Sequence, residues 1–243
     1  MLRTWVKAAA AAGVCGLAVA ACGTVHMGAA AIVGNQRVSS STLSAEVSNL
    51  KAGYQQYHGK VQLQYSASQA PQQVLGWIVR FKVRDRLAQR EGITVTPTEV
   101  SQALSSIEAS IKQSGESAPL PAVAVANGLP PDMLSQLGQY QAIETKLLNR
   151  LDGGKLPSAS SAQTALEAKF NKSQCLAAKS LDIQINPQFG ELNYSDFSVV
   201  AAPTKLSATQ TSKSAAKVTR NPPCQGPGGG FRRYCWVTHP RRR

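Results

Sequence analysis

Apolar residues recur every three or four positions over most of this chain, which is the spacing of one face of an α-helix. The first such stripe begins after Ser41 and ends before the turn residues His58-Gly59; its members are Leu43, Val47, Leu50, Tyr54 and Tyr57. Four more helical stretches are predicted, over residues 71–91, 97–114, 133–152 and 161–180. The pattern therefore predicts a block of about five helices.

The clearest helix start in the chain is the sequence Thr96-Pro97-Thr98-Glu99. A Thr followed three residues later by Glu forms a capping box, and proline is favoured at the first helical position. The segment 115–121, which contains Gly115 and ends in proline, is predicted as a loop.

Extended segments lie on both sides of the helical block. Residues 29–33 are apolar and are followed by a turn at 34–37, which predicts a strand with a turn. After the helices, Leu181, Ile183 and Ile185 alternate with polar residues, and residues 197–200 predict a last short strand. We therefore expect a mostly helical α+β domain over residues 28–203.

The first 21 residues have the pattern of a secretory signal peptide. Arg3 and Lys7 precede an apolar stretch, residues 8–21, that ends in small residues. A membrane-spanning helix needs about 20 apolar residues, so this stretch is predicted to be cleaved rather than retained.

The cleavage site is predicted between Ala21 and Cys22. The sequence Val19-Ala20-Ala21-Cys22 resembles the bacterial lipobox, in which the cysteine becomes the lipidated, typically palmitate-bearing, first residue of the mature protein. Two acyl chains on Cys22 would hold the protein firmly on a membrane. Residues 22–27 then form a tether at the extracytoplasmic face of the bacterial cell membrane. The alternative is an ordinary cysteine beside a conventional cleavage site.

Most of the formal net charge of +13 belongs to the two ends of the chain. Residues 22–203 hold fifteen Lys or Arg and thirteen Asp or Glu, whereas residues 204–243 hold nine basic and no acidic residues. The folded part is nearly neutral, so no nucleic-acid partner is expected.

The segment 204–243 is rich in Ser, Lys, Gly, Pro and Arg and cannot build a packed core, which predicts a disordered basic tail. One interpretation is an arm that contacts anionic lipid. The alternatives are a solvated tail and a shifted reading frame. Within it, Cys224 and Cys235 are candidates for a small disulfide loop.

Two further sets of residues receive structural interpretations. Arg80, Lys82, Arg84, Arg86 and Arg90 are predicted to lie on a solvated face of the second helix. Cys175 is predicted to be a small buried hydrophobic residue, since an odd number of cysteines argues against a disulfide framework.

Catalytic and metal-binding motifs are lacking in the sequence. It contains no HExxH, GxSxG, phosphate-binding loop or CxxC. A serine or cysteine nucleophile needs a histidine base, and the folded part offers His58 alone, predicted at a helix end on the surface. We therefore expect no catalytic residue, no metal, no cofactor and no enzymatic activity.

The order of the pieces resembles a known family. The lipobox cysteine, the sequence Ala30-Ala31-Ile32-Val33-Gly34-Asn35-Gln36-Arg37-Val38-Ser39 and the later Asn186-Pro187-Gln188-Phe189-Gly190 are similar to lipoproteins with the SurA N-terminal domain. That family includes the SurA and PrsA chaperones and foldases, and the resemblance covers about residues 28–200. It implies that the first strand pairs with a strand after the helices in a small antiparallel sheet. SurA and PrsA carry a parvulin prolyl isomerase domain, and we expect none in this chain.

The resemblance implies a non-enzymatic, chaperone-like module that binds unfolded or nascent exported proteins. The alternative is an envelope lipoprotein that uses the same fold to bind one specific protein partner or a small ligand, because a fold does not determine a function.

Overall fold

The computed structural model describes residues 28–154 and 160–202. The signal peptide, the tether and the basic tail predicted from sequence lie outside the described residues. Among the described ones, no helix has the length and apolar character needed to cross a bilayer.

The chain begins with a β-hairpin formed by β1 (Ala29–Val33) and β2 (Gln36–Ser39), as the sequence predicts. Gly34 and Asn35 make a two-residue turn, and the positive φ of 62° at Gly34 is a conformation that glycine adopts without strain. β1 also pairs antiparallel with β3 (Gln184–Ile185), so the sheet order is β2-β1-β3. The expected pairing across the helical block is thereby confirmed.

Six α-helices lie between these strands in the described chain, one more than the sequence predicts. They are α1 (Ser40–Gln56), α2 (Ala70–Glu91), α3 (Pro97–Gln113), α4 (Leu120–Ala126), α5 (Leu134–Leu151) and α6 (Ser160–Lys179). Short 3₁₀ turns, η1 (Ala67–Gln69) and η2 (Pro131–Met133), precede α2 and α5. The mostly helical α+β fold class is confirmed.

The unexpected helix is α4, which begins inside the predicted loop 115–121. Six of its seven residues are buried, so it has no polar face and no amphipathic period to detect. Tertiary contacts hold it in place. The indole Nε1 of Trp77 donates to the Asn127 carbonyl at 3.0 Å, and the Tyr65 hydroxyl donates to the Val125 carbonyl at 3.2 Å.

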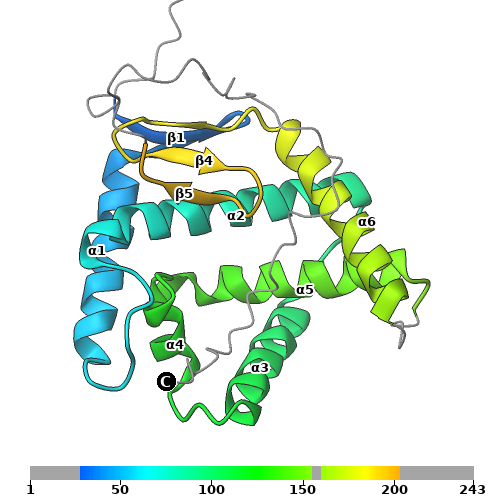
Figure 1. The fold of residues 1–243 in the computed structure, drawn as a ribbon, viewed down its shortest axis with the longest axis horizontal. Coiled ribbons are helices and arrows are strands. Elements are labelled where there is room, and N and C mark those ends of the chain that lie inside the picture. The colour runs from blue at the N-terminus through cyan, green and yellow to red at the C-terminus, as the bar shows by residue number, and fades with distance from the viewer. Residues whose placement is uncertain (1–27, 155–159, 203–243) are drawn as a thin grey trace, which may run out of the picture.

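α2 is the central element of the fold. Figure 1 shows it crossing the middle of the molecule, with the strands along one side and α5 along the other. It contacts α1, α5, α6, β1 and β5, and its apolar side chains are buried on several faces. Gly92 ends α2 in a left-handed conformation, as the sequence predicts.

A second sheet was not expected from the sequence. β4 (Glu191–Asn193) and β5 (Ser198–Val200) form a separate antiparallel hairpin that lies on α2. Phe197 and Val199 are buried beneath it. The last predicted strand therefore exists, but it pairs with β4 and not with β1.

Candidate functional site

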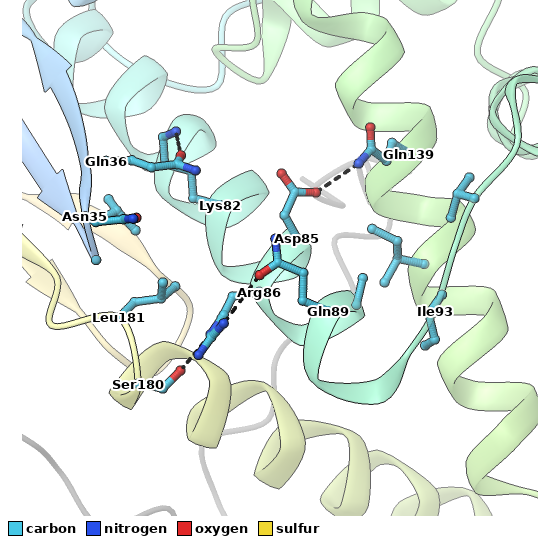
Figure 2. A pocket seen from close by; sticks show the side chains of 15 residues that line it. Asn35, Gln36, Lys82, Asp85, Arg86, Gln89, Ile93, Gln139, Ser180 and Leu181 are labelled. Atoms are coloured by element: carbon cyan, nitrogen blue, oxygen red, sulfur yellow. Dashed lines mark hydrogen bonds between the residues drawn. The ribbon is translucent and has the colours of Figure 1, made fainter.

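A polar cleft of about 780 Å³ lies where the β1–β2 turn, α2, α5 and the end of α6 meet. Its lining includes apolar side chains, among them Val33, Ile93 and Ile143. Its walls carry amide, hydroxyl and charged groups; those drawn in Figure 2 are Asn35, Gln36, Lys82, Asp85, Arg86, Gln89, Gln139 and Ser180. Binding sites are usually concave and carry polar groups that orient the ligand.

One wall of the cleft is a polar stripe of α2. Lys82, Asp85, Arg86 and Gln89 are spaced by three, one and three residues, which places them on one face of the helix. The stripe interrupts a helix whose neighbouring residues are mostly buried. The spacing of these polar residues is visible in the sequence. The stripe was not identified there, because the basic residues of this helix were treated as one solvated face.

Hydrogen bonds link this stripe to each of the other walls, as Figure 2 shows. The ammonium of Lys82 donates to the side-chain oxygen of Gln36 in the hairpin turn. Gln139 on α5 donates through Nε2 to Asp85 Oδ1 at 3.0 Å. Arg86 has two neutral partners, donating from Nε to Ser180 Oγ at 3.3 Å and from Nη1 to Gln89 Oε1 at 3.4 Å.

The cleft reduces the hydration of its charged groups. Burial raises the pKa of Asp85, opposed by the nearby Lys82 charge and by the hydrogen bond from Gln139. Burial likewise lowers the pKa of Lys82, opposed by Asp85. Both shifts disfavour the charged form, as desolvation does.

Two of the five basic residues predicted on a solvated helix face are buried, and that prediction is wrong for them. Arg84 is 1% exposed and donates from Nη1 to Glu144 Oε2 at 3.1 Å, with its guanidinium over the rings of Tyr140 and Phe170. Arg80 is 3% exposed and donates to the Asp196 carbonyl at 3.2 Å. The β4–β5 hairpin and α6 cover these side chains, and neither contact is visible in the local pattern.

A second hollow, of about 590 Å³, lies beside the end of α1 and includes the predicted surface histidine. His58 is exposed and stands edge-on to Tyr54, with ring centroids 5.6 Å apart. Gly59, Lys60 and Val61 also line this hollow, and none of its residues is an acid. The part of the chain that the structure describes therefore gives His58 no carboxylate within this hollow to orient it for base catalysis.

The remaining candidate residues fall in different places. Ala21 and Cys22 lie outside the described residues, as do Cys224 and Cys235. Cys175 on α6 is half-buried and disulfide-bonded, so the prediction of a small buried hydrophobic residue is wrong.

No group of three or more His, Cys, Asp or Glu side chains in residues 28–154 and 160–202 is arranged to hold a metal ion. One pair of acids, Glu46 on α1 and Asp132 in η2, lies close together. Asn49 bridges them, donating to Asp132 Oδ2 at 2.7 Å and to Glu46 Oε2 at 3.4 Å. Burial first, and the Asp132 charge second, raise the pKa of Glu46.

Comparison with known proteins gives one result. A family model described as the SurA-like N-terminal domain matches residues 3–148, which confirms the resemblance inferred from the sequence. The match ends within α5, so α6 and the strands β3 to β5 lie beyond it. No curated protein and no solved structure matches the chain.

Proposed function

The chain belongs to the family of SurA-like N-terminal domains, and on that premise we propose that it is a chaperone-type module that binds unfolded or nascent exported proteins without catalysing a reaction. The family is chaperone-related. The observation that carries the proposal is the polar cleft beside α2, which has the volume of a ligand site and polar groups on every wall.

The described surface indicates how such binding would work. Among residues 28–154 and 160–202, the large apolar side chains that are well exposed are Leu176 and Val200, at 38% and 46%. A binding face made of broad hydrophobic patches needs a contiguous apolar area of a few hundred Å². Client segments would therefore bind as extended chains through polar contacts, with half-buried aromatic residues such as Tyr54 and Tyr57 as supplementary contacts.

Membrane attachment is the second part of the proposal. Cleavage after Ala21 and diacylation of Cys22 would hold the domain at the extracytoplasmic face of the membrane. Since β1 begins at Ala29, seven residues after Cys22, even an extended tether would keep the domain within about 25 Å of the bilayer. The basic residues of 204–243 would add about 1 kcal/mol each near anionic lipid.

A client-aggregation assay tests the chaperone function. The full chain, extracted in detergent, is mixed with a chemically denatured client, and light scattering is followed on dilution. Suppression of scattering at molar excess, with no ATP added, is the expected result. Unchanged scattering at a tenfold excess, with the chain itself still folded by circular dichroism, would contradict the proposal.

A second candidate function is a lipoprotein scaffold for one specific partner or small ligand. The scarcity of exposed apolar side chains favours it, because a general client surface usually shows more. A photocrosslinking amino acid at position 89, on the cleft wall, separates the two candidates. Crosslinks to many exported proteins support the chaperone, whereas one stoichiometric product supports the scaffold.

A further inference from the structure

The cleft beside α2 carries two cations, Lys82 and Arg86, that donate hydrogen bonds to neutral groups. Lys82 donates to an amide oxygen of Gln36, and Arg86 donates to the Ser180 hydroxyl and to the amide oxygen of Gln89. The ion pairs found within the described residues join Arg84 to Glu144 and Lys146 to Glu99. Neither Lys82 nor Arg86 takes part in them.

The one acid of the cleft, Asp85, offsets at most one of these two charges. Asp85 accepts a hydrogen bond from Gln139 on the opposite wall, and its charge also interacts with that of Lys82. Lys82 and Arg86 are four residues apart and therefore neighbours on one helix face. Two cations against one acid leave the walls with an excess positive charge in a concave site, and such a site attracts anions.

We propose that this cleft binds a peptide carboxylate, with Lys82 and Arg86 as the cations that recognise it. The inference rests on the proposed function and names the chemistry that the cleft would select in its clients. A carboxylate is planar and accepts paired hydrogen bonds from a guanidinium. It would displace neutral oxygens from Arg86 and Lys82, so no charged group loses its partner when the ligand enters.

The other groups of the cleft suit the rest of a peptide. Asn35, Gln36 and Gln89 have amide side chains, which both donate and accept hydrogen bonds and so match backbone N–H and C=O groups. No aromatic side chain lines the cleft, so it offers no stacking surface for a nucleotide base. The presence of Asp85 further disfavours a phosphate with two negative charges.

The carboxylate can come from an acidic side chain or from the carboxyl terminus of a client, and three fluorescent octapeptides distinguish these sources. All share one uncharged polar sequence. The first has a central Asp and an amidated end, the second has Asn there and an amidated end, and the third has Asn and a free carboxyl end. Binding to the full chain in detergent is measured by fluorescence polarisation.

At least one carboxylate peptide is expected to bind about tenfold more tightly than the neutral peptide, as charge-assisted hydrogen bonds warrant. Lys82→Gln combined with Arg86→Gln should remove that preference. Lys112→Gln, on the exposed side of α3 near its end, is the matched control and should leave it unchanged. Asp85→Asn should increase it, because the substitution removes a negative charge from the site.

Equal binding of all three peptides, or a preference unchanged in the double variant, would overturn the proposal. If the double variant does not fold by circular dichroism, Asp85→Asn decides: unchanged or weaker binding of the carboxylate peptide overturns the proposal. The aggregation assay keeps the two proposals apart. Suppression of client aggregation without any carboxylate preference would remove this inference and leave the chaperone function standing.

Discussion

Single side chains show how this domain stabilises charge in its interior. The guanidinium carbon of Arg84 lies 3.9 Å from the centroid of the Tyr140 ring and 4.8 Å from that of Phe170, and the group pairs with Glu144. A buried ion pair contributes little net stability, but losing one partner is costly because the other charge is then unpaired. Arg84 therefore joins α2, α5 and α6 through packing as much as through charge.

Replacing Arg84 with alanine is expected to lower the free energy of unfolding by about 3 kcal/mol, since it removes buried packing and leaves Glu144 without its cation. Denaturant unfolding measures the effect. Arg90→Ala, at the exposed end of the same helix, is the control and should change stability by less than about 0.5 kcal/mol. The double variant Arg84→Met with Glu144→Leu should lose less stability than Arg84→Ala, because it leaves no unpaired charge. Equal losses in the free energy of unfolding for Arg84→Ala and Arg90→Ala would refute this role of Arg84.

The acid pair at Glu46 and Asp132 makes stability depend on pH. A carboxyl group whose pKa is raised on folding contributes stability below its unfolded pKa, about 4.3 for Glu, and this is lost as pH rises through the folded pKa. Ionised Glu46 therefore destabilises the domain at neutral pH. Glu46→Gln should raise the melting temperature at pH 7, and the gain should disappear below about pH 4.

Glu99 provides the opposite case on α3. The hydrogen bond from Lys146, then that from the Thr96 backbone, lowers the pKa of Glu99 to about 2. Its stabilisation is therefore present above the unfolded pKa and lost as pH falls toward about 2. Glu99→Gln should therefore lower the melting temperature at pH 7, whereas Glu46→Gln should raise it. Equal changes of the same sign in Glu99→Gln and Glu46→Gln would contradict the opposite pKa shifts of these two acids.

Among the secondary structure elements, glycine positions show how closely the helices pack. A Cβ atom at Gly138 on α5 would lie 2.8 Å from Val100 Cγ1 and 2.9 Å from Leu104 Cγ, both on α3. A Cβ atom at Gly76 on α2 would make ordinary contact, 3.5 Å from the Val199 nitrogen. The α3–α5 contact therefore requires glycine, while the α2–β5 contact does not.

The same substitution should thus have opposite effects in these two helices. Gly138→Ala is expected to destabilise the domain by about 1 to 3 kcal/mol, because α3 must move away from α5. Gly76→Ala is expected to stabilise it by about 0.5 to 1 kcal/mol, because alanine favours the helical backbone. Thermal unfolding of the two variants side by side provides the measurement. Stabilisation by Gly138→Ala would show that the two helices are less tightly packed.

At the scale of the whole molecule, the two ends of the described chain meet. The hairpin at its start pairs with β3, and Asn186 donates from its backbone N–H to the Ala30 carbonyl at 2.9 Å and from its side chain to the Ala29 carbonyl at 2.9 Å. The Gly34 amide also donates to the Leu181 carbonyl. The cleft exists because this closure brings the hairpin turn and the end of α6 beside α2.

Under the proposed function, membrane attachment and folding are separable. Cys22→Ala should release the protein from the membrane fraction or leave it unprocessed, because the substitution removes the thiol that the acyl chains would modify. The melting temperature of the domain should remain unchanged. Intact-mass analysis of the membrane-extracted wild type should find Cys22 at the amino terminus with added acyl mass; an unmodified terminus would refute the anchor.

Local signals in the sequence predicted five of the six described helices, because an amphipathic face, a capping box and terminal glycines are properties of neighbouring residues. The same signals failed for α4 and β4. α4 is buried on nearly all sides and so has no periodicity, while β4 has three residues and depends on its pairing with β5.

The sequence by itself determined the helical block, its bracketing strands, the near-neutral charge of the body and the family resemblance, since each depends on composition or on short-range spacing. The tertiary structure alone decided which charged residues of α2 are buried and which line a cleft. Arg84 and Arg86 are two positions apart and chemically alike, yet Arg84 lies over the aromatic rings of α5 and α6 whereas Arg86 is on the cleft wall. Burial depends on what the distant parts of the chain cover, and no local pattern contains that information.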